Sequence, residues 1–268
     1  MKKIIILLLS LLIGSLSFAQ VGIGTTTPDH SAALDVESTN KGFLPPRMTE
    51  ADRNAITTPA AGLIVWCTNC GSNGEGQIFN GTSWTNMIGG AAAEAPPQIG
   101  DFRDGGVVFY VAAMSEDLNG DGTMDAGLVC AVEDQSTGIQ WYNGSYINTN
   151  ATASAIGTGA ANTAKIITNQ GTGSYAASVR DNYSITVAGT TYSDWFLPSK
   201  DELNEMYQNK ATIDATANDN EGSSFASANY WSSTENSYSL AWGQYFDSGF
   251  QDSYDRFFTF RVRAVRAF

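Results

Sequence analysis

Oxygen-bearing side chains recur at alternate positions of one short segment, residues 117–125. The segment reads Asp-Leu-Asn-Gly-Asp-Gly-Thr-Met-Asp, and the glycine at its sixth position permits a sharp turn. Calcium takes about six to eight oxygen ligands, and this spacing can wrap a loop around one ion. We therefore predict calcium as a cofactor, held by Asp117, Asn119, Asp121, Thr123 and Asp125.

The same loop has a second interpretation. Its twelfth position is Leu128, where an EF-hand carries a bidentate glutamate, so the loop is not an EF-hand. It is closer to the short Asp/Asn/Gly calcium loops of extracellular repeat proteins. Aspartate, asparagine and glycine are also the usual residues of a plain hairpin loop, and that alternative stays open.

A second group of residues that could bind a ligand lies between 236 and 258, where tyrosine and tryptophan are interspersed with serine, asparagine, glutamine and aspartate. Such mixtures are typical of binding loops, because the rings give rigid contact area and the polar groups give adaptable hydrogen bonds. They also suit sugar rings. A polar hairpin surface without function is the alternative. We predict a ligand-binding surface comprising Tyr238, Trp242, Gln244, Tyr245, Asp247, Asp252 and Tyr254.

Catalysis finds little support in the sequence. His30 is the single histidine, so the second half of the chain cannot build a Ser–His or Cys–His pair. Cys67 and Cys70 lack partners for a four-ligand zinc site, which favours a small disulfide. Cys130 lies in a strand-like run and is expected to be an inert core thiol. We predict no catalytic residues and no enzyme, although a carboxylate pair for glycoside hydrolysis stays open as a minor alternative.

The beginning of the chain indicates export. Residues 1–19 combine Lys2 and Lys3 with an apolar run and a small-residue cleavage pattern, which predicts a signal peptide. The run is too short to span a membrane, and no later segment is long and apolar enough. A net charge of −13 disfavours nucleic acid as a partner. We expect a secreted protein, extracellular or on the outer cell surface.

The elements that must position these residues fall into two modules. Residues 89–98 are mostly small residues and proline and predict a linker. Residues 20–88 predict short strands, with a short helix at 49–56. This β-rich module is poor in apolar bulk, so it is expected to be structural and to oligomerise. Residues 99–268 are long enough to bury a core. Within them, Ser199 and Glu202 form a capping box that predicts a helix running to about Asn209.

Several blocks of the larger module carry a family resemblance. They are Trp195–Leu203, Tyr230–Glu235, Ala241-Trp242 and Val262–Arg266. These blocks resemble the C-terminal domain family of Legionella collagen-like protein and the related Fibrobacter-type major paralogous domain. The resemblance implies a C-type-lectin-like α+β fold after a small, mostly β module. Residues 21–87 are similar to a module of exported Bacteroidetes-type proteins and to phage tail-fibre shafts, which implies a homotrimer.

Four residues of these blocks have an expected structural role. Trp195 and Trp231 should lie in the core, because large aromatics flanked by small residues usually pack there. Arg263 and Arg266 should pair with acids such as Glu235 or Asp201. Together the observations predict a cell-surface binding or adhesion protein that presents its C-terminal loops to a glycan or protein ligand. The alternative is a purely structural part of a surface appendage.

Overall fold

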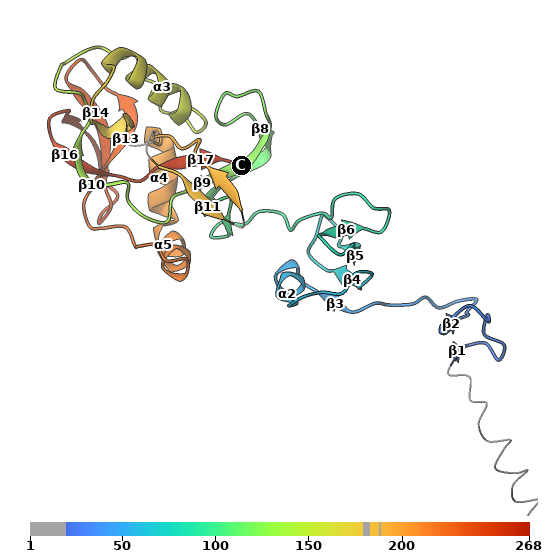
Figure 1. The fold of residues 1–268 in the computed structure, drawn as a ribbon. Helices are drawn as coiled ribbons and strands as arrows, with labels where there is room; N and C mark the ends of the chain where they lie inside the picture. The colour runs from blue at the N-terminus through green and yellow to red at the C-terminus, as the bar shows by residue number, and fades with distance from the viewer. Residues whose placement is uncertain (1–19, 179–182, 188) are drawn as a thin grey trace, which may run out of the picture. The chain divides into compact units, whose positions relative to one another are not determined.

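Two compact units make up the chain (Figure 1). The computed structural model describes residues 20–178, 183–187 and 189–268. The first unit extends to Pro96 and the second begins at Pro97. The predicted signal peptide, residues 1–19, lies outside the described residues.

Short strands dominate the first unit. Strands β1 (Val21–Ile23) and β2 (Leu34–Val36) form a parallel pair. A separate four-stranded sheet has the order β3-β4-β5-β6, in which the strands are β3 (Arg47–Met48), β4 (Ile64–Cys67), β5 (Glu75–Phe79) and β6 (Trp84–Asn86). Asn80 and Gly81 make the tight turn between β5 and β6, and Gly81 takes a φ of 102°. The mostly β character predicted for this module is confirmed.

One short helix, α2 (Glu50–Asn54), lies inside the predicted helical stretch. Thr49 caps it, because its hydroxyl accepts the backbone N–H of Asp52 while the Asp52 carboxylate accepts the N–H of Thr49. Arg53, in the last turn, donates to the buried side chain of Gln77 on β5 and pairs with Glu50 at 3.1 Å. Polar contacts therefore attach the helix to the sheet.

Two further features complete the first unit. Cys67 and Cys70 form a disulfide, as the sequence predicted, with their Cα atoms 5.4 Å apart. The segment predicted as a linker contributes to this unit as well: the backbone N–H of Ala93 donates to Glu75 at 2.7 Å, and that of Ala95 donates to Glu50 at 2.7 Å. The division between the units thus falls near the end of the predicted linker, at Pro96.

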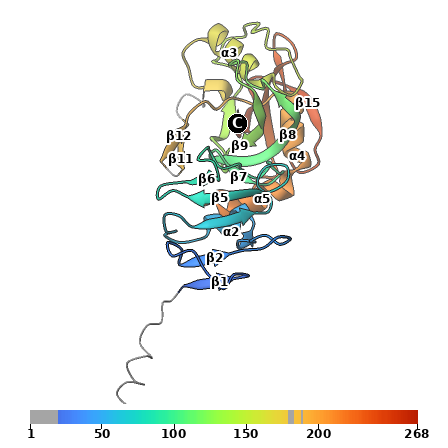
Figure 2. The same cartoon turned by 90° about the vertical axis from the view of Figure 1, so that its right-hand side faces the viewer.

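The second unit contains two main sheets. The first has the order β17-β9-β8-β7, in which the strands are β7 (Phe102–Arg103), β8 (Gly106–Glu116), β9 (Asp125–Cys130) and β17 (Val265–Ala267). The last strand of the chain thus pairs with β9, and Figure 2 shows the C-terminus beside that strand. The beginning and the end of the unit therefore share one sheet.

The second sheet has five strands in the order β10-β16-β13-β14-β15. Its members are β10 (Ser136–Gln140), β13 (Asn229–Glu235), β14 (Leu240–Tyr245), β15 (Gln251–Asp255) and β16 (Thr259–Val262). A small hairpin joins β11 (Ile185–Val187) to β12 (Thr190–Tyr192). All the residues predicted to bind a ligand except Tyr238 and Asp247 lie on β14 or β15.

The described residues of the second unit also include the helices α3 (Gly159–Gln170), α4 (Lys200–Gln208) and α5 (Lys210–Asp219). The capping box of Ser199 and Glu202 starts α4, as predicted. Helix α4 contacts β8 of one sheet and both β13 and β14 of the other, so it joins the two sheets. The α+β fold class is confirmed.

The core residues behave largely as the sequence indicated. Trp195 and Trp231 are both fully buried, as predicted. The expected acidic partners of the two C-terminal arginines are wrong, however: Arg263 pairs with Asp134 at 2.8 Å, and Arg266 pairs with Asp194 at 2.7 Å. These partners come from segments distant in sequence, which spacing alone does not reveal.

Candidate binding surface

The residues predicted to bind a ligand are divided between two faces of one hairpin. In the β14–β15 register, Trp242 lies opposite Ser253 and Ala241 lies opposite Tyr254. Because successive side chains on a strand point to opposite faces, Trp242 and Tyr254 point away from each other. Gln244 shares the face of Trp242. Tyr245 and Asp252 share the face of Tyr254.

The face that carries Trp242 and Gln244 is directed towards α4. The ammonium group of Lys200 lies 3.7 Å from the centre of the Trp242 ring, within cation–π range. Gln244 is fully buried, and its amide donates to Asn204 at 3.0 Å and to the carbonyl of Gly249 at 3.1 Å. Gln244 therefore holds α4 and the β14–β15 turn together, and a ligand cannot reach it in this conformation.

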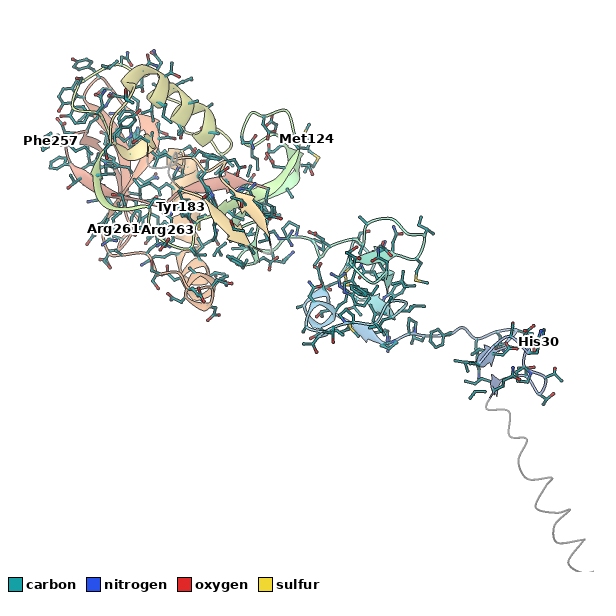
Figure 3. All side chains as sticks on the ribbon, viewed as in Figure 1. His30, Met124, Tyr183, Phe257, Arg261 and Arg263 are labelled. Carbon is teal, nitrogen blue, oxygen red and sulfur yellow. A yellow bond between two sulfur atoms is a disulfide. The ribbon has the colours of Figure 1, made fainter. Side chains whose placement is uncertain are left out.

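The opposite face carries a row of aromatic rings. Tyr254 packs edge-on against Phe260 with ring centres 4.9 Å apart, and Phe260 stacks with Phe258 at 6.1 Å. Phe257 follows Phe258 at 4.5 Å. We call these four residues the aromatic row. Phe257 is 46 % exposed and Phe258 is 44 % exposed, and Figure 3 shows Phe257 at the edge of the second unit.

The sheet below supports the aromatic row. Phe260 packs on the buried ring of Trp231, with ring centres 4.2 Å apart. Gly243 makes room for it, since a Cβ at that position would lie 3.3 Å from the Phe260 ring. The row is therefore built on regular strands and a buried tryptophan. Such support limits the conformational entropy that the rings lose on binding a partner.

A second aromatic group, the tyrosine cluster, comprises Tyr142, Tyr146 and Tyr238. The Tyr146 ring centre lies 4.8 Å from that of Tyr142 and 5.8 Å from that of Tyr238. The Tyr146 hydroxyl donates to the Asp255 carboxylate, and this hydrogen bond is the main cause that raises the pKa of Tyr146. The same carboxylate oxygen accepts the backbone N–H of Phe257 at 3.2 Å. The tyrosine cluster and the aromatic row thus meet at Asp255.

A buried ion pair anchors the loops that carry both groups. The Arg256 guanidinium lies 3.1 Å from the Glu235 carboxylate, and both side chains are almost fully buried. Arg256 also donates to the carbonyl oxygens of Ile147 and Ser237, which lie beside Tyr146 and Tyr238 in sequence. Burial lowers the pKa of Arg256, and the Glu235 carboxylate opposes that shift. One guanidinium therefore ties together three aromatic-bearing loops.

The sequence predicts part of this surface. Tyr238 and Tyr254 belong to the predicted binding residues, whereas the other members of the aromatic row and of the tyrosine cluster do not. A signal was present, because Phe257 and Phe258 are adjacent and cannot both point into the core from one regular strand. The remaining predicted residues, Tyr245, Asp247 and Asp252, lie on the same hairpin: Tyr245 is half-buried, and the two aspartates are exposed.

The predicted calcium loop connects β8 to β9. The Asp117 carboxylate accepts the backbone N–H groups of Gly120 at 2.6 Å and Gly122 at 3.0 Å, and Asp125 accepts that of Leu118 at 2.8 Å. Within residues 20–178, 183–187 and 189–268, no three acidic, thiol or imidazole side chains form a group that could hold a metal. The loop carboxylates thus bond to backbone amides in this conformation, and calcium binding stays a prediction.

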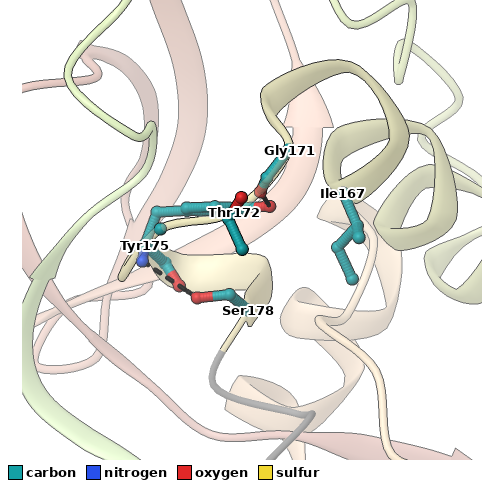
Figure 4. Close-up of a pocket in the computed structure, with 6 residues that line it drawn as sticks. Ile167, Gly171, Thr172, Tyr175 and Ser178 are labelled. Carbon is teal, nitrogen blue, oxygen red and sulfur yellow. Dashed lines mark hydrogen bonds between the residues drawn. The ribbon is translucent and has the colours of Figure 1, made fainter.

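A small pocket opens at the end of α3 (Figure 4). It encloses about 220 Å³ and is lined by Ile167, Gly171, Thr172, Gly173, Tyr175 and Ser178. The Tyr175 hydroxyl donates to the carbonyl of Gly171 at 2.7 Å, and Ser178 accepts the backbone N–H of Tyr175 at 3.0 Å. These groups stabilise the local turn.

Cys130 and His30 lie in very different environments. Cys130 is fully buried, and burial raises its pKa to about 12, so the thiolate that would react is scarce at neutral pH. His30 lies in the first unit with its side chain almost fully exposed. Figure 3 shows it on the loop between β1 and β2. No described helix is long and apolar enough to cross a membrane.

Comparison with known families matches both units. The profile of the phage tail like trimerisation region matches residues 22–99. The profile of the Lcl C-terminal domain matches residues 130–266, about half of the chain, and covers the five-stranded sheet, α3, α4 and α5. No curated protein is similar enough to the chain to count as a match.

Proposed function

Because the chain belongs to the family of the Lcl C-terminal domain, we propose that it is a binding or adhesion protein whose second unit presents the candidate surface to a glycan or protein ligand. The two matched domains fit a surface or appendage protein, which is the broader statement from which the proposal starts. Export through the predicted signal peptide belongs to the same proposal.

The aromatic row and the tyrosine cluster carry this proposal. Tyr238, Phe257 and Phe258 are exposed in turns beside the five-stranded sheet and give apolar contact area. Such rings dominate the energetics of many interfaces. Asp255 and the tyrosine hydroxyls add hydrogen-bonding groups at the same place. Aromatic rings beside carboxylates suit both the apolar C–H face of a sugar and an aromatic side chain of a protein.

The first unit supports a trimeric arrangement. Its match to a trimerisation region favours a homotrimer in which three second units are displayed together. The same match favours the second candidate function, a purely structural component of a surface appendage, in which the second unit would act as a cap. The two candidates differ in whether the candidate surface binds a ligand.

We further propose that the protein works without catalysis, in keeping with the buried Cys130 of the second unit and the exposed His30 of the first unit. The net charge of −13 makes a polyanionic ligand unfavourable. A neutral glycan or a protein is therefore the preferred ligand class. Nucleic acid is disfavoured for the same reason.

The proposal is tested by screening the purified full-length protein on glycan and protein arrays. The double variant Phe257→Ala/Phe258→Ala should bind the ligand at least about tenfold more weakly, because it removes both exposed rings at the end of the row. Phe250→Ala is the matched control, since Phe250 is 61 % exposed but lies in the β14–β15 turn, at the other end of β15.

Two results would count against the proposal. If the wild-type protein binds nothing on either array, the structural alternative gains support. If the double variant binds as well as the wild type and Phe250→Ala does not, the binding surface has been placed at the wrong end of the sheet.

A further inference from the structure

The two-stranded sheet at the start of the described chain has one apolar face. Strands β1 and β2 are parallel, and Val21 pairs with Leu34 while Ile23 pairs with Val36. Paired residues on neighbouring strands point to the same face, and residues two apart on a strand also share a face. Four aliphatic side chains therefore lie on one face: Val21, Ile23, Leu34 and Val36.

The opposite face of this sheet is covered by the protein itself. A Cβ added at Gly22 would point to that face and would lie 2.8 Å from the Thr25 carbonyl oxygen and 2.9 Å from Pro28. Asp35 points to the same face, and its carboxylate accepts the backbone N–H of Asp29 at 2.8 Å. The loop between β1 and β2 thus closes one face of the pair and leaves the aliphatic face open.

The aliphatic face is exposed to solvent in the single chain. The exposed fractions are 53 % for Val21, 54 % for Ile23, 51 % for Leu34 and 41 % for Val36. A two-stranded sheet with an open apolar face is marginal in water, because it buries too little surface to offset its loss of conformational entropy. A hollow of about 360 Å³ borders Ile23 and Val36 at the end of the strands.

We propose that this aliphatic face packs against the same face of two other copies of the chain, around a threefold axis, and that β1 and β2 become stable only in that assembly. The inference rests on the proposed trimer. The trimerisation-region match begins at Gly22 and therefore includes β2 and all of β1 except Val21, yet it does not say which face is shared. A membrane is a poor alternative occupant, since Asp29, Asp35 and Glu37 would repel anionic lipids.

Light scattering of the purified full-length protein tests the assembly. The wild type should be a trimer, and the variant Leu34→Ser/Val36→Ser should lose the trimer, because it replaces half of the aliphatic face with hydroxyl groups. Met114→Ser is the matched control, since Met114 is 83 % exposed on β8 of the second unit. An unchanged near-ultraviolet spectrum would show that the second unit of the double variant is still folded.

Cysteine cross-linking identifies the face independently of stability. Under mild oxidation, Val36→Cys should form disulfide-linked dimers, because three thiols near one axis can make one bond between chains. Asp35→Cys should not cross-link, because its side chain points to the covered face. The native Cys67–Cys70 disulfide and the buried Cys130 should not interfere.

The outcomes separate this inference from the proposed function. A monomeric wild type overturns the trimer and the shared face together. A trimer that survives Leu34→Ser/Val36→Ser, or one in which Asp35→Cys cross-links as well as Val36→Cys, overturns the shared face and leaves the proposed trimer intact.

Discussion

Glu202 shows at the scale of one residue how a carboxylate can be both buried and essential to the fold. Its side chain is fully buried and accepts backbone N–H groups from Ser199 at 2.8 Å, Gly157 at 2.9 Å and Gly159 at 3.2 Å. These contacts start α4 and fix the loop before α3. Burial nevertheless raises the pKa of Glu202 to about 7, from an ordinary value of 4.5.

This pKa shift predicts a pH-dependent stability. Between pH 4.5 and 7 the folded state should bind more protons at Glu202 than the unfolded state, so the free energy of unfolding should fall as pH rises through that window. The loss should reach at most about 3 kcal/mol. Urea unfolding of wild type and Glu202→Gln at several pH values measures it, because the glutamine variant lacks this titration.

Asp201→Asn is the matched control, since Asp201 is exposed in the same first turn of α4. The stability difference between wild type and Glu202→Gln should change across the window, whereas the difference for Asp201→Asn should stay nearly constant. If the stability difference between wild type and Glu202→Gln stays constant with pH, the three backbone N–H donors to Glu202 fully offset the effect of burial on its pKa.

At the scale of elements, the sequence predicted the features that depend on residues close together in the chain. The capping box of Ser199 and Glu202 set the start of α4, because both partners lie within one turn. Helix α5 was missed, since its threonine, asparagine and aspartate residues have weak helix propensity and its packing against β8 decides the outcome.

The division of the predicted binding residues has a similar cause. Composition placed Trp242 and Tyr254 in one group, but the strand register sends them to opposite faces. Register depends on the partner strand and on the turn, neither of which composition reveals. The role of Arg256 was also hidden, because its partner Glu235 lies on β13, far from the turn after β15 in the sequence.

The loop between β8 and β9 is the element that is predicted to bind calcium. Burial raises the pKa of Asp125, and the neighbouring carboxylates of Asp121 and Asp117 raise it further. These acids therefore lie close enough to repel one another. A bound calcium ion would relieve that repulsion, although it would have to replace part of the present bonding between carboxylates and backbone amides.

Calcium should therefore raise the melting temperature of the second unit. At a free concentration of about one hundred times the dissociation constant, the gain is about 2.7 kcal/mol, which corresponds to several degrees. Scanning calorimetry with calcium chloride or with a chelator measures it. Asp121→Asn should abolish the gain, whereas Asp219→Asn, an exposed residue at the end of α5, should retain it. Identical melting temperatures with calcium chloride and with the chelator would contradict the predicted calcium binding.

At the scale of the whole molecule, we propose that the first unit forms the trimer and the second unit binds the ligand. The first unit has an exposed aliphatic face that we propose is covered by other copies of the chain, and the second unit has exposed aromatic rings beside its five-stranded sheet. A trimer would therefore display three copies of the aromatic surface. The two family matches cover different units of the chain. Linking three second units through the first unit would allow multivalent binding, which raises the overall affinity.

Multivalency gives the last prediction. The trimeric wild type should bind a surface densely coated with the ligand found on the arrays about 10²–10⁴ times more tightly than the variant Leu34→Ser/Val36→Ser. On a sparsely coated surface the two proteins should bind equally, because each second unit then acts alone. Interferometry at both densities measures the effect, with Met114→Ser as the trimeric control. Equal binding of wild type and variant to the dense surface would show that the second units do not engage the ligand together, so that trimerisation serves a structural purpose.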